Sequence, residues 1–154
     1  MNTNNNTILF LIGRILVGSF YLYTGLDNFI HLTEKIGYAT FKGVPVPTLG
    51  VIVASSLLVI AGLSILLGYR PVLGIAAIVL FLVPVTVLMH NFWTISDPLM
   101  QEIEFHSFEA NIGLAGSALF FLAIPRPWLW SLDEWLAARE SLRERKTKRQ
   151  LMAE

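Results

Sequence analysis

The chain has 154 residues, of which 55% are hydrophobic and only 14% are charged, whereas a soluble domain carries about 25% charged residues. It contains no cysteine, which excludes disulfides, thiolate metal ligands and cysteine nucleophiles. The formal net charge is zero, but basic residues concentrate near the C-terminus, and the length suits one domain. We therefore expect an all-α protein whose apolar runs cross a membrane.

The first apolar run extends from Ile8 to Ile30 and is long enough for a bilayer core, which needs about 20 helical residues. Its start lacks the basic region of a secretory signal, so we interpret it as a retained membrane helix. Arg14 lies near that start and is expected to reach the near headgroups. Asp27, Asn28 and His31 end the run, and the spacing of Asp27 and His31 places both on one helix face.

A loop is predicted from Thr33 to Thr48, because the prolines and glycine of Lys42–Pro47 oppose regular helix. The second apolar run extends from Leu49 to Gly68 and the third from Val72 to Met89. The turn between these runs is short, so the two helices should be antiparallel neighbours. Pro84 is expected to kink the third helix.

His90 and Trp93 close the third run, and an acidic segment follows it. Asp97 is predicted to cap a helix that has Pro98 in its first position. This helix leads into the fourth apolar run, from Phe105 to Ile124. The sequence thus predicts a bundle of four transmembrane helices.

Prolines at 125 and 127 should end the fourth helix, and the tryptophans that follow are expected near the lipid headgroups: Trp128, Trp130 and Trp135. Ser131 and Glu134 fit a capping box that opens one more helix. We expect residues 1–127 to form the four-helix transmembrane domain. Residues 128–154 are expected to form an amphipathic interfacial helix and a basic cytoplasmic tail.

Four crossings place both termini on one side of the membrane. Nine basic residues then share the side of the termini, and two, Lys35 and Lys42, lie on the other. The positive-inside rule predicts a multi-pass protein of the inner membrane with both termini in the cytoplasm. The segment from His90 to His106 would face outward.

The order of several short motifs resembles the DoxX family: Gly13-Arg14, Tyr23-Thr24-Gly25, Lys42–Pro47, Ala61-Gly62-Leu63, His90-Asn91-Phe92-Trp93, and Phe108 with Asn111. The resemblance covers residues 8–124 and implies a four-helix membrane protein. Some members are similar to the small subunit of a thiosulfate:quinone oxidoreductase, and others are linked to membrane redox complexes. The resemblance therefore implies a subunit of a quinone-linked redox system.

A ligand site is predicted near the outer face, where polar side chains gather at helix ends: Asp27, Asn28, His90, Glu109 and Asn111. Ionisable groups at membrane depth are costly and are therefore functional candidates. With Trp93 beside them they would suit a quinone headgroup or another small polar ligand, to which His90 donates a hydrogen bond. The alternative is an interhelical hydrogen-bond network that only stabilises the bundle.

The second candidate is a divalent metal site, because histidine and carboxylate ligands also gather at the outer end: His31, His90, His106 and Glu102. The alternative is that polar residues collect at helix ends because the interface is wet. Quinone is the leading cofactor, and a metal ion or haem b between two histidines is an alternative.

Two other functions stay open beside the redox subunit. The first is a non-catalytic assembly or scaffold protein, and the second is a permease for a small solute or metal. Whether the chain is an enzyme is left open. The lipid bilayer is the expected partner, joined by a membrane subunit or a second copy. No nucleic-acid partner is expected, because the basic tail is short and follows the tryptophans that anchor at the membrane.

Overall fold

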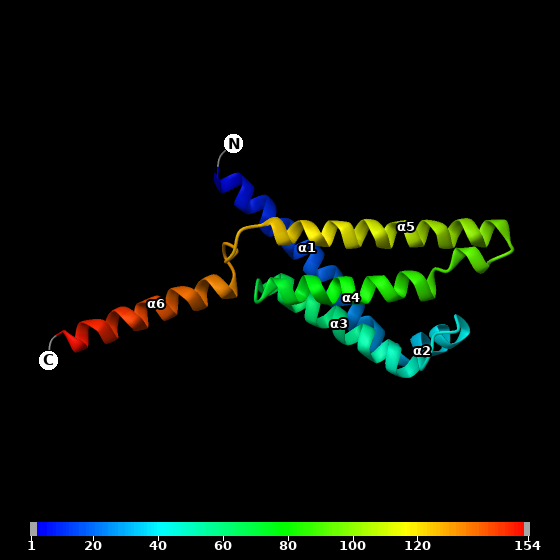
Figure 1. The fold of residues 1–154 in the computed structure, drawn as a ribbon, viewed down its shortest axis with the longest axis horizontal. Helices are drawn as coiled ribbons and strands as arrows, with labels where there is room; N and C mark the ends of the chain where they lie inside the picture. Colours follow the sequence, from blue (N-terminus) through cyan, green and yellow to red (C-terminus); the bar gives the residue numbers. More distant parts are fainter. Residues whose placement is uncertain (1–2, 153–154) are drawn as a thin grey trace.

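The computed structural model describes residues 3–152, all of whose regular elements are helices (Figure 1). The all-α prediction is therefore confirmed for the described part of the chain. Residues 1, 2, 153 and 154, which the expected domains included, lie outside it. The elements in order are α1 (Thr3–Ile30), α2 (Leu32–Phe41), α3 (Pro47–Leu67), α4 (Pro71–Met89), the 3-10 helix η1 (Phe92–Thr94), α5 (Pro98–Phe120), the 3-10 helix η2 (Phe121–Ala123) and α6 (Leu132–Leu151).

Three helical stretches within residues 3–152 are long and apolar enough to cross a membrane: Asn6–Ile30, Pro47–Leu67 and Pro71–Thr94. They correspond to the first three runs expected from the sequence. The helix α5 includes most of the fourth run, whose last residues form η2, but it is less apolar, because its first half carries Glu102, Glu104, His106 and Glu109. The structure therefore has three membrane-crossing candidates and a fourth long helix, α5, beside them.

The helices α1 and α3 are in close contact at three glycines. A Cβ atom placed on Gly62 would lie 2.5 Å from the backbone nitrogen of Leu22, and one on Gly18 would lie 2.9 Å from the backbone nitrogen of Leu66. Gly25 faces the backbone nitrogen of Val59 at 2.8 Å in the same way. Small residues let membrane helices approach until their backbones touch, so any side chain at these positions would separate α1 from α3.

The helix α5 is held more loosely. Within the described residues α5 packs along α4 and against η1 and η2, but not along α1 or α3. Ala118 is the one buried residue of α5. A Cβ atom added at Gly113 or Gly116 would meet no atom within 4 Å, so this face of α5 is open rather than packed.

Arg14 is buried, with 3% of its surface exposed, and does not reach outward to the headgroups as expected. Its guanidinium donates to the carbonyl oxygens of Leu129 at 3.2 Å and Trp130 at 2.7 Å. The segment after η2 folds back over the end of α1 and presents these carbonyls. Arg14 therefore joins the first helix to a segment more than a hundred residues later.

Trp128 belongs to the core, so its expected place near the headgroups was wrong. It is 1% exposed and packs edge-on against Phe10 of α1 with ring centroids 5.1 Å apart. It also contacts Phe121 of η2 at a centroid distance of 5.8 Å. Trp130 and Trp135 are exposed, as an interfacial position requires.

One segment of the predicted loop is helical. Residues Leu32–Phe41 form the helix α2 within the predicted loop, because only the part from Lys42 onward contains the glycine and prolines that oppose helix. Both predicted N-caps are confirmed: Asp97 accepts from the backbone N–H of Met100 and Ser131 from that of Glu134. The capping box is formed in part, because the carboxylate of Glu134 accepts from the backbone N–H of Trp130 rather than from that of Ser131. Beyond Ser131, α6 points away from the bundle with no buried residue (Figure 1), and its contact with a membrane stays a prediction.

The two ends of the bundle are distinct. Both termini and α6 lie toward one end, and α2 and the connection from α4 to α5 lie at the opposite end (Figure 1). We call the second of these the outer end and the first the inner end. Arg14 and its carbonyl partners lie at the inner end, and all three histidines lie at the outer end.

Candidate functional site

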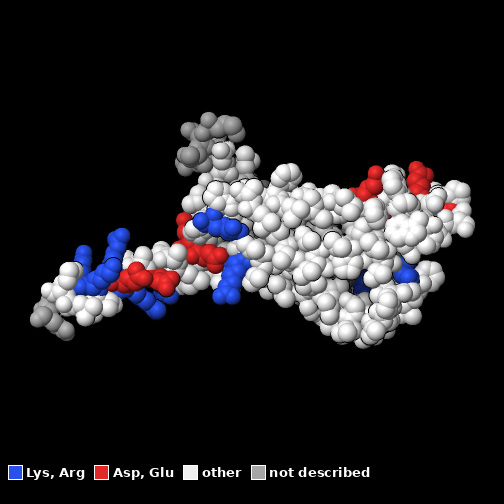
Figure 2. All heavy atoms as spheres, viewed as in Figure 1, with Lys and Arg blue, Asp and Glu red and all other residues white. Residues whose placement is uncertain are grey.

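A cavity of about 690 Å³ opens in the half of the bundle that includes the outer end. Residues of α1, α2, α3, α4 and α5 line it, together with Val44, Pro45 and Val46 of the connection between α2 and α3. The walls are mostly aliphatic. Figure 2 shows basic atoms set back in a hollow at the end opposite to α6, and the basic residue in the cavity wall is Lys35.

The side chains of seven lining residues carry nitrogen or oxygen atoms: Tyr21, Thr24, Asn28, Lys35, Tyr38, His90 and Asn111. They come from α1, α2, α5 and the end of α4. An apolar space with a few convergent polar groups is the usual form of a small-molecule site, and such sites commonly measure about 300–1,000 Å³. The cavity is therefore the candidate functional site.

Three of the six residues predicted to bind a ligand line this cavity: Asn28, His90 and Asn111. They lie on α1, after α4 and on α5, so only the tertiary structure brings them to one space. Whether they bind a ligand stays a prediction.

The other three, Asp27, Trp93 and Glu109, are not in the cavity wall. Asp27 turns toward α2, where it pairs with Lys35 at 3.0 Å and with His31 at 3.0 Å. Glu109 lies on the exposed face of α5 with His106. Trp93 is half exposed and stacks edge-on against Phe92 and Phe108. One step along a helix rotates a side chain by about 100°, which separates Asp27 from Asn28.

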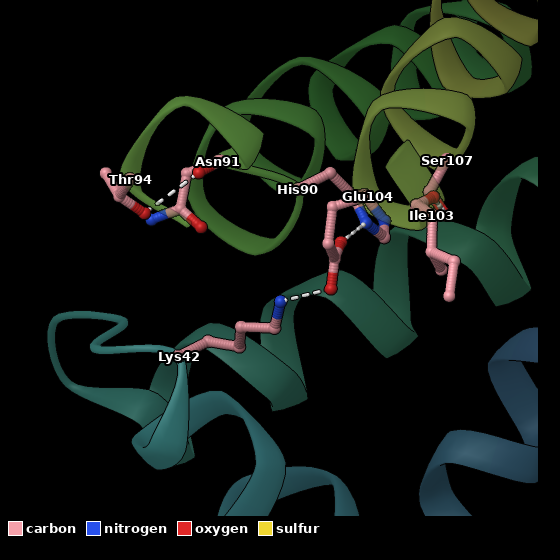
Figure 3. Close-up of polar contacts among 7 residues, drawn as sticks. All are labelled: Lys42, His90, Asn91, Thr94, Ile103, Glu104 and Ser107. Atoms are coloured by element: carbon pink, nitrogen blue, oxygen red, sulfur yellow. Dashed lines mark hydrogen bonds and ion pairs between the residues drawn. The ribbon is translucent and has the colours of Figure 1, made fainter. Parts of the chain in front are cut away.

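A cluster of three side chains closes the outer end beside the cavity (Figure 3). Lys42 Nζ donates to Glu104 Oε1, and His90 Nδ1 lies 2.8 Å from Glu104 Oε2. We call Lys42, Glu104 and His90 the outer clamp. The side chains are 11%, 16% and 23% exposed, respectively, so the clamp is partly shielded from water.

The charge state of Glu104 follows from these contacts. Partial burial raises the pKa of Glu104, but the hydrogen bonds and positive charge of Lys42 and His90 outweigh it, so the pKa lies below its usual value. Glu104 is therefore ionised at neutral pH. It holds the connection after α2 against both α5 and the end of α4.

The sequence indicated neither Lys35, Tyr38 nor Lys42 as part of a site. Lys35 and Tyr38 lie on α2. In a predicted loop their spacing does not indicate that they share one helix face. Lys42 and Glu104 are 62 residues apart. The one available signal was the presence of a lysine and a glutamate at helix ends assigned to the same side of the membrane.

Each histidine has its own carboxylate partners. His31 pairs with Asp27, His90 with Glu104, and His106 with Glu102 and Glu109. Among residues 3–152 no group of three or more histidine, aspartate or glutamate side chains has the arrangement of a metal site. The metal site predicted at His31, His90, His106 and Glu102 stays a prediction.

Comparisons with known proteins agree with the helical membrane architecture. The family model DoxX matches residues 9–91. The chain is 28% identical over 128 residues to the inner membrane protein YphA of Escherichia coli strain K12, an alignment that covers 82% of this chain and 89% of that protein. No solved structure matches. The residues matched by the family model include Asn28, Lys42 and His90, whereas Glu104 and Asn111 lie beyond the matched range.

Proposed function

Because this chain belongs to the DoxX family and is an inner-membrane protein of that kind, we propose that it is the ligand-holding subunit of a membrane redox system. The ligand is a quinone-type molecule, with a polar head and an apolar tail, bound in the cavity near the outer face. The observation that carries the proposal is the cavity itself, which combines aliphatic walls with Asn28, His90 and Asn111.

The proposal includes four crossings, with α5 as the fourth. The helix α5 runs beside α4 and returns to the end where the termini lie (Figure 1), so a membrane that contains α4 also surrounds α5. Its glutamates lie in the half that begins at the outer end. The positive-inside rule then assigns both termini and α6 to the cytoplasm, because Lys35 and Lys42 alone lie at the outer end.

The cavity fits the chemistry of such a ligand. Aliphatic residues of α3 and α4 offer space for an apolar tail, and the amides of Asn28 and Asn111 can bond to the oxygens of a ring. The wall includes half-exposed residues such as Phe20 of α1 and Leu114 of α5. A molecule dissolved in the bilayer can therefore enter sideways. Electrons come from a partner subunit, and this chain's residues bind and orient the ring.

The experiment that tests binding uses a photoreactive quinone with the protein in lipid nanodiscs. We expect label on peptides that line the cavity, competed by excess unlabelled quinone. Asn111→Leu should lower the labelling about tenfold, because it removes an amide that can donate one hydrogen bond to a ring oxygen. The matched control is His106→Gln, because His106 lies at the same end but outside the cavity wall.

Two outcomes would contradict the proposal. Labelling that excess quinone does not reduce would show that the cavity is not a specific site. Equal loss in Asn111→Leu and His106→Gln would show that the outer end, rather than the cavity, determines the signal.

A second function, assembly of a membrane complex, is favoured by the open face of α5. A Cβ atom added at Gly113 or Gly116 would meet no atom within 4 Å. Small residues at a lipid-facing surface suit a closely packed partner helix. Gly116→Leu should then remove a stoichiometric partner from gently solubilised membranes. Gly37→Leu, at another open glycine on α2, is the control. Retention of the partner by both variants would contradict the assembly function.

A further inference from the structure

His90 is the one residue shared by the cavity and the outer clamp. It lines the cavity, and its Nδ1 atom is 2.8 Å from the carboxylate of Glu104. No other hydrogen bond of the His90 ring occurs within residues 3–152. Its second ring nitrogen, Nε2, is therefore the atom that remains for a ligand.

The proton on His90 can be assigned from its partner. An ionised carboxylate only accepts hydrogen bonds, and Lys42 holds Glu104 in the ionised form by donating to its other oxygen. Nδ1 of His90 must then carry a hydrogen and donate it to Glu104. In a neutral imidazole one nitrogen donates and the other accepts, so in the neutral form of His90 the Nε2 atom carries no proton.

We propose that neutral His90 presents an unprotonated Nε2 to the cavity, and that the bound ligand therefore carries a hydroxyl group that donates to it, as a phenol or the reduced quinol form does. This inference rests on the proposed function for its ligand class, whereas the proton assignment stands on the clamp alone. It reverses the expectation from sequence that His90 donates to a quinone carbonyl.

The clamp also gives the bound hydroxyl a path for its proton. When the ligand's O–H bond breaks, Nε2 accepts the proton and the ring becomes an imidazolium, whose charge the carboxylate of Glu104 stabilises. Only a proton moves, from the ligand oxygen to Nε2, and the electron pair of the O–H bond stays on the oxygen. The step is therefore balanced without an oxidant. Glu104 does not touch the ligand and is a positioning residue, in the manner of a carboxylate that orients a catalytic histidine.

Other charged groups around His90 have partners of their own. Lys35 on α2 lines the same cavity and pairs with Asp27 of α1. Lys42, from the connection after α2, pairs with Glu104 of α5. Within the described residues Glu104 is thus the one carboxylate that contacts His90, and substitution of Glu104 is the direct way to change which nitrogen carries the proton.

The proton assignment is tested on ligand-free protein by ¹⁵N NMR of the imidazole rings, because protonated and unprotonated nitrogens resonate far apart. The His90 signal is assigned by its loss in His90→Gln. At neutral pH we expect a protonated Nδ1 and an unprotonated Nε2. Glu104→Gln should shift this balance toward the form protonated at Nε2, and Glu104→Asp should restore it in part. A ring protonated at Nε2 in the unchanged protein would overturn the inference.

The ligand class is tested with a pair of redox-inert probes, 4-octylphenol and its methyl ether. In the ether a methyl group replaces the hydroxyl hydrogen, so its oxygen cannot donate a hydrogen bond. We expect the phenol to bind about tenfold tighter at neutral pH, the difference of one hydrogen bond to a polar group. Glu104→Gln should reduce that preference, and His106→Gln should leave it unchanged.

The outcomes separate the two claims. Equal binding of phenol and ether, with quinone labelling intact, would overturn the hydroxyl inference and leave the proposed function standing. Failure of both probes and of the quinone to bind would overturn the proposed function and the ligand class with it. The NMR result would still decide the proton assignment.

Discussion

The helices α1 and α3 are joined along their length, whereas α5 is joined to them at its two ends. Between α1 and α3 the backbones meet at Gly18, Gly25 and Gly62. At the inner end Arg14 binds the segment that follows α5 and η2, and at the outer end Lys42 binds Glu104 of α5.

This difference explains where the cavity lies. Close backbone contact leaves no room between α1 and α3 for anything else. Where α5 faces α1 and α3, end contacts by two cations replace continuous packing, and the space between them stays open. The two cations therefore hold α5 in position while leaving room between their contacts for the candidate site.

The largest expected effect comes from breaking the tight contact. Gly62→Ala places a methyl group 2.5 Å from the backbone nitrogen of Leu22, and overpacking of this kind costs about 1–3 kcal/mol. We expect a lower free energy of unfolding, measured by tryptophan fluorescence during thermal unfolding in detergent. Gly116→Ala on α5 is the control, and it should be neutral or stabilising, because alanine is the better helix former by about 1 kcal/mol. Similar losses in both variants would remove the distinction between the two regions.

Removing Arg14, the cation at the inner end, is expected to have an effect of similar size. Arg14→Met removes two donors to the carbonyls of Leu129 and Trp130, and a hydrogen bond to a charged group contributes about 1.5–3 kcal/mol. The segment from 124 to 131 should detach, so Trp128 becomes accessible to a fluorescence quencher and the chain to protease. Arg126→Met, at an exposed arginine of the same segment, is the control. A Trp128 signal that stays shielded in Arg14→Met would contradict this role.

The contact between Lys42 and Glu104 at the outer end should make the attachment of α5 dependent on pH. Because the pKa of Glu104 is lower in the folded protein than its ordinary value of 4.5, its contribution to stability is complete above pH 4.5. The contribution is lost as the pH falls through the lower folded value. Glu104→Gln should abolish that part of the acid dependence and cost about 1–2 kcal/mol at neutral pH. An unchanged acid profile in Glu104→Gln would show that the outer clamp does not hold α5.

The smallest effect is expected at the other carboxylate–histidine contacts of the outer end. His106 is 66% exposed, and exposed ion pairs contribute about 0–1 kcal/mol. His106→Ala should therefore leave stability within about 0.5 kcal/mol. A loss as large as that of Glu104→Gln would mean that burial does not distinguish the two histidines, and the outer clamp would have no special role.

Much of the fold followed from the sequence, and the misses have local causes. The three apolar runs became α1, α3 and α4 because length and composition alone decide whether a helix can cross a bilayer. The sequence did not indicate α2, because the glycine and prolines of residues 42–47 oppose helix and the loop predicted from them began too early, at Thr33. The burial of Trp128 was missed because a tryptophan near a helix end suits an interface as well as a core.

The sequence by itself determined that this protein is helical, lies in a membrane and carries its polar groups at helix ends, since these properties depend on composition and spacing along one chain. Only the tertiary structure decided that Asn28, His90 and Asn111 share a cavity while Asp27, Glu109 and Trp93 lie outside it. The rotation of each helix about its own axis depends on what packs against it. A pattern within one helix does not specify that neighbour.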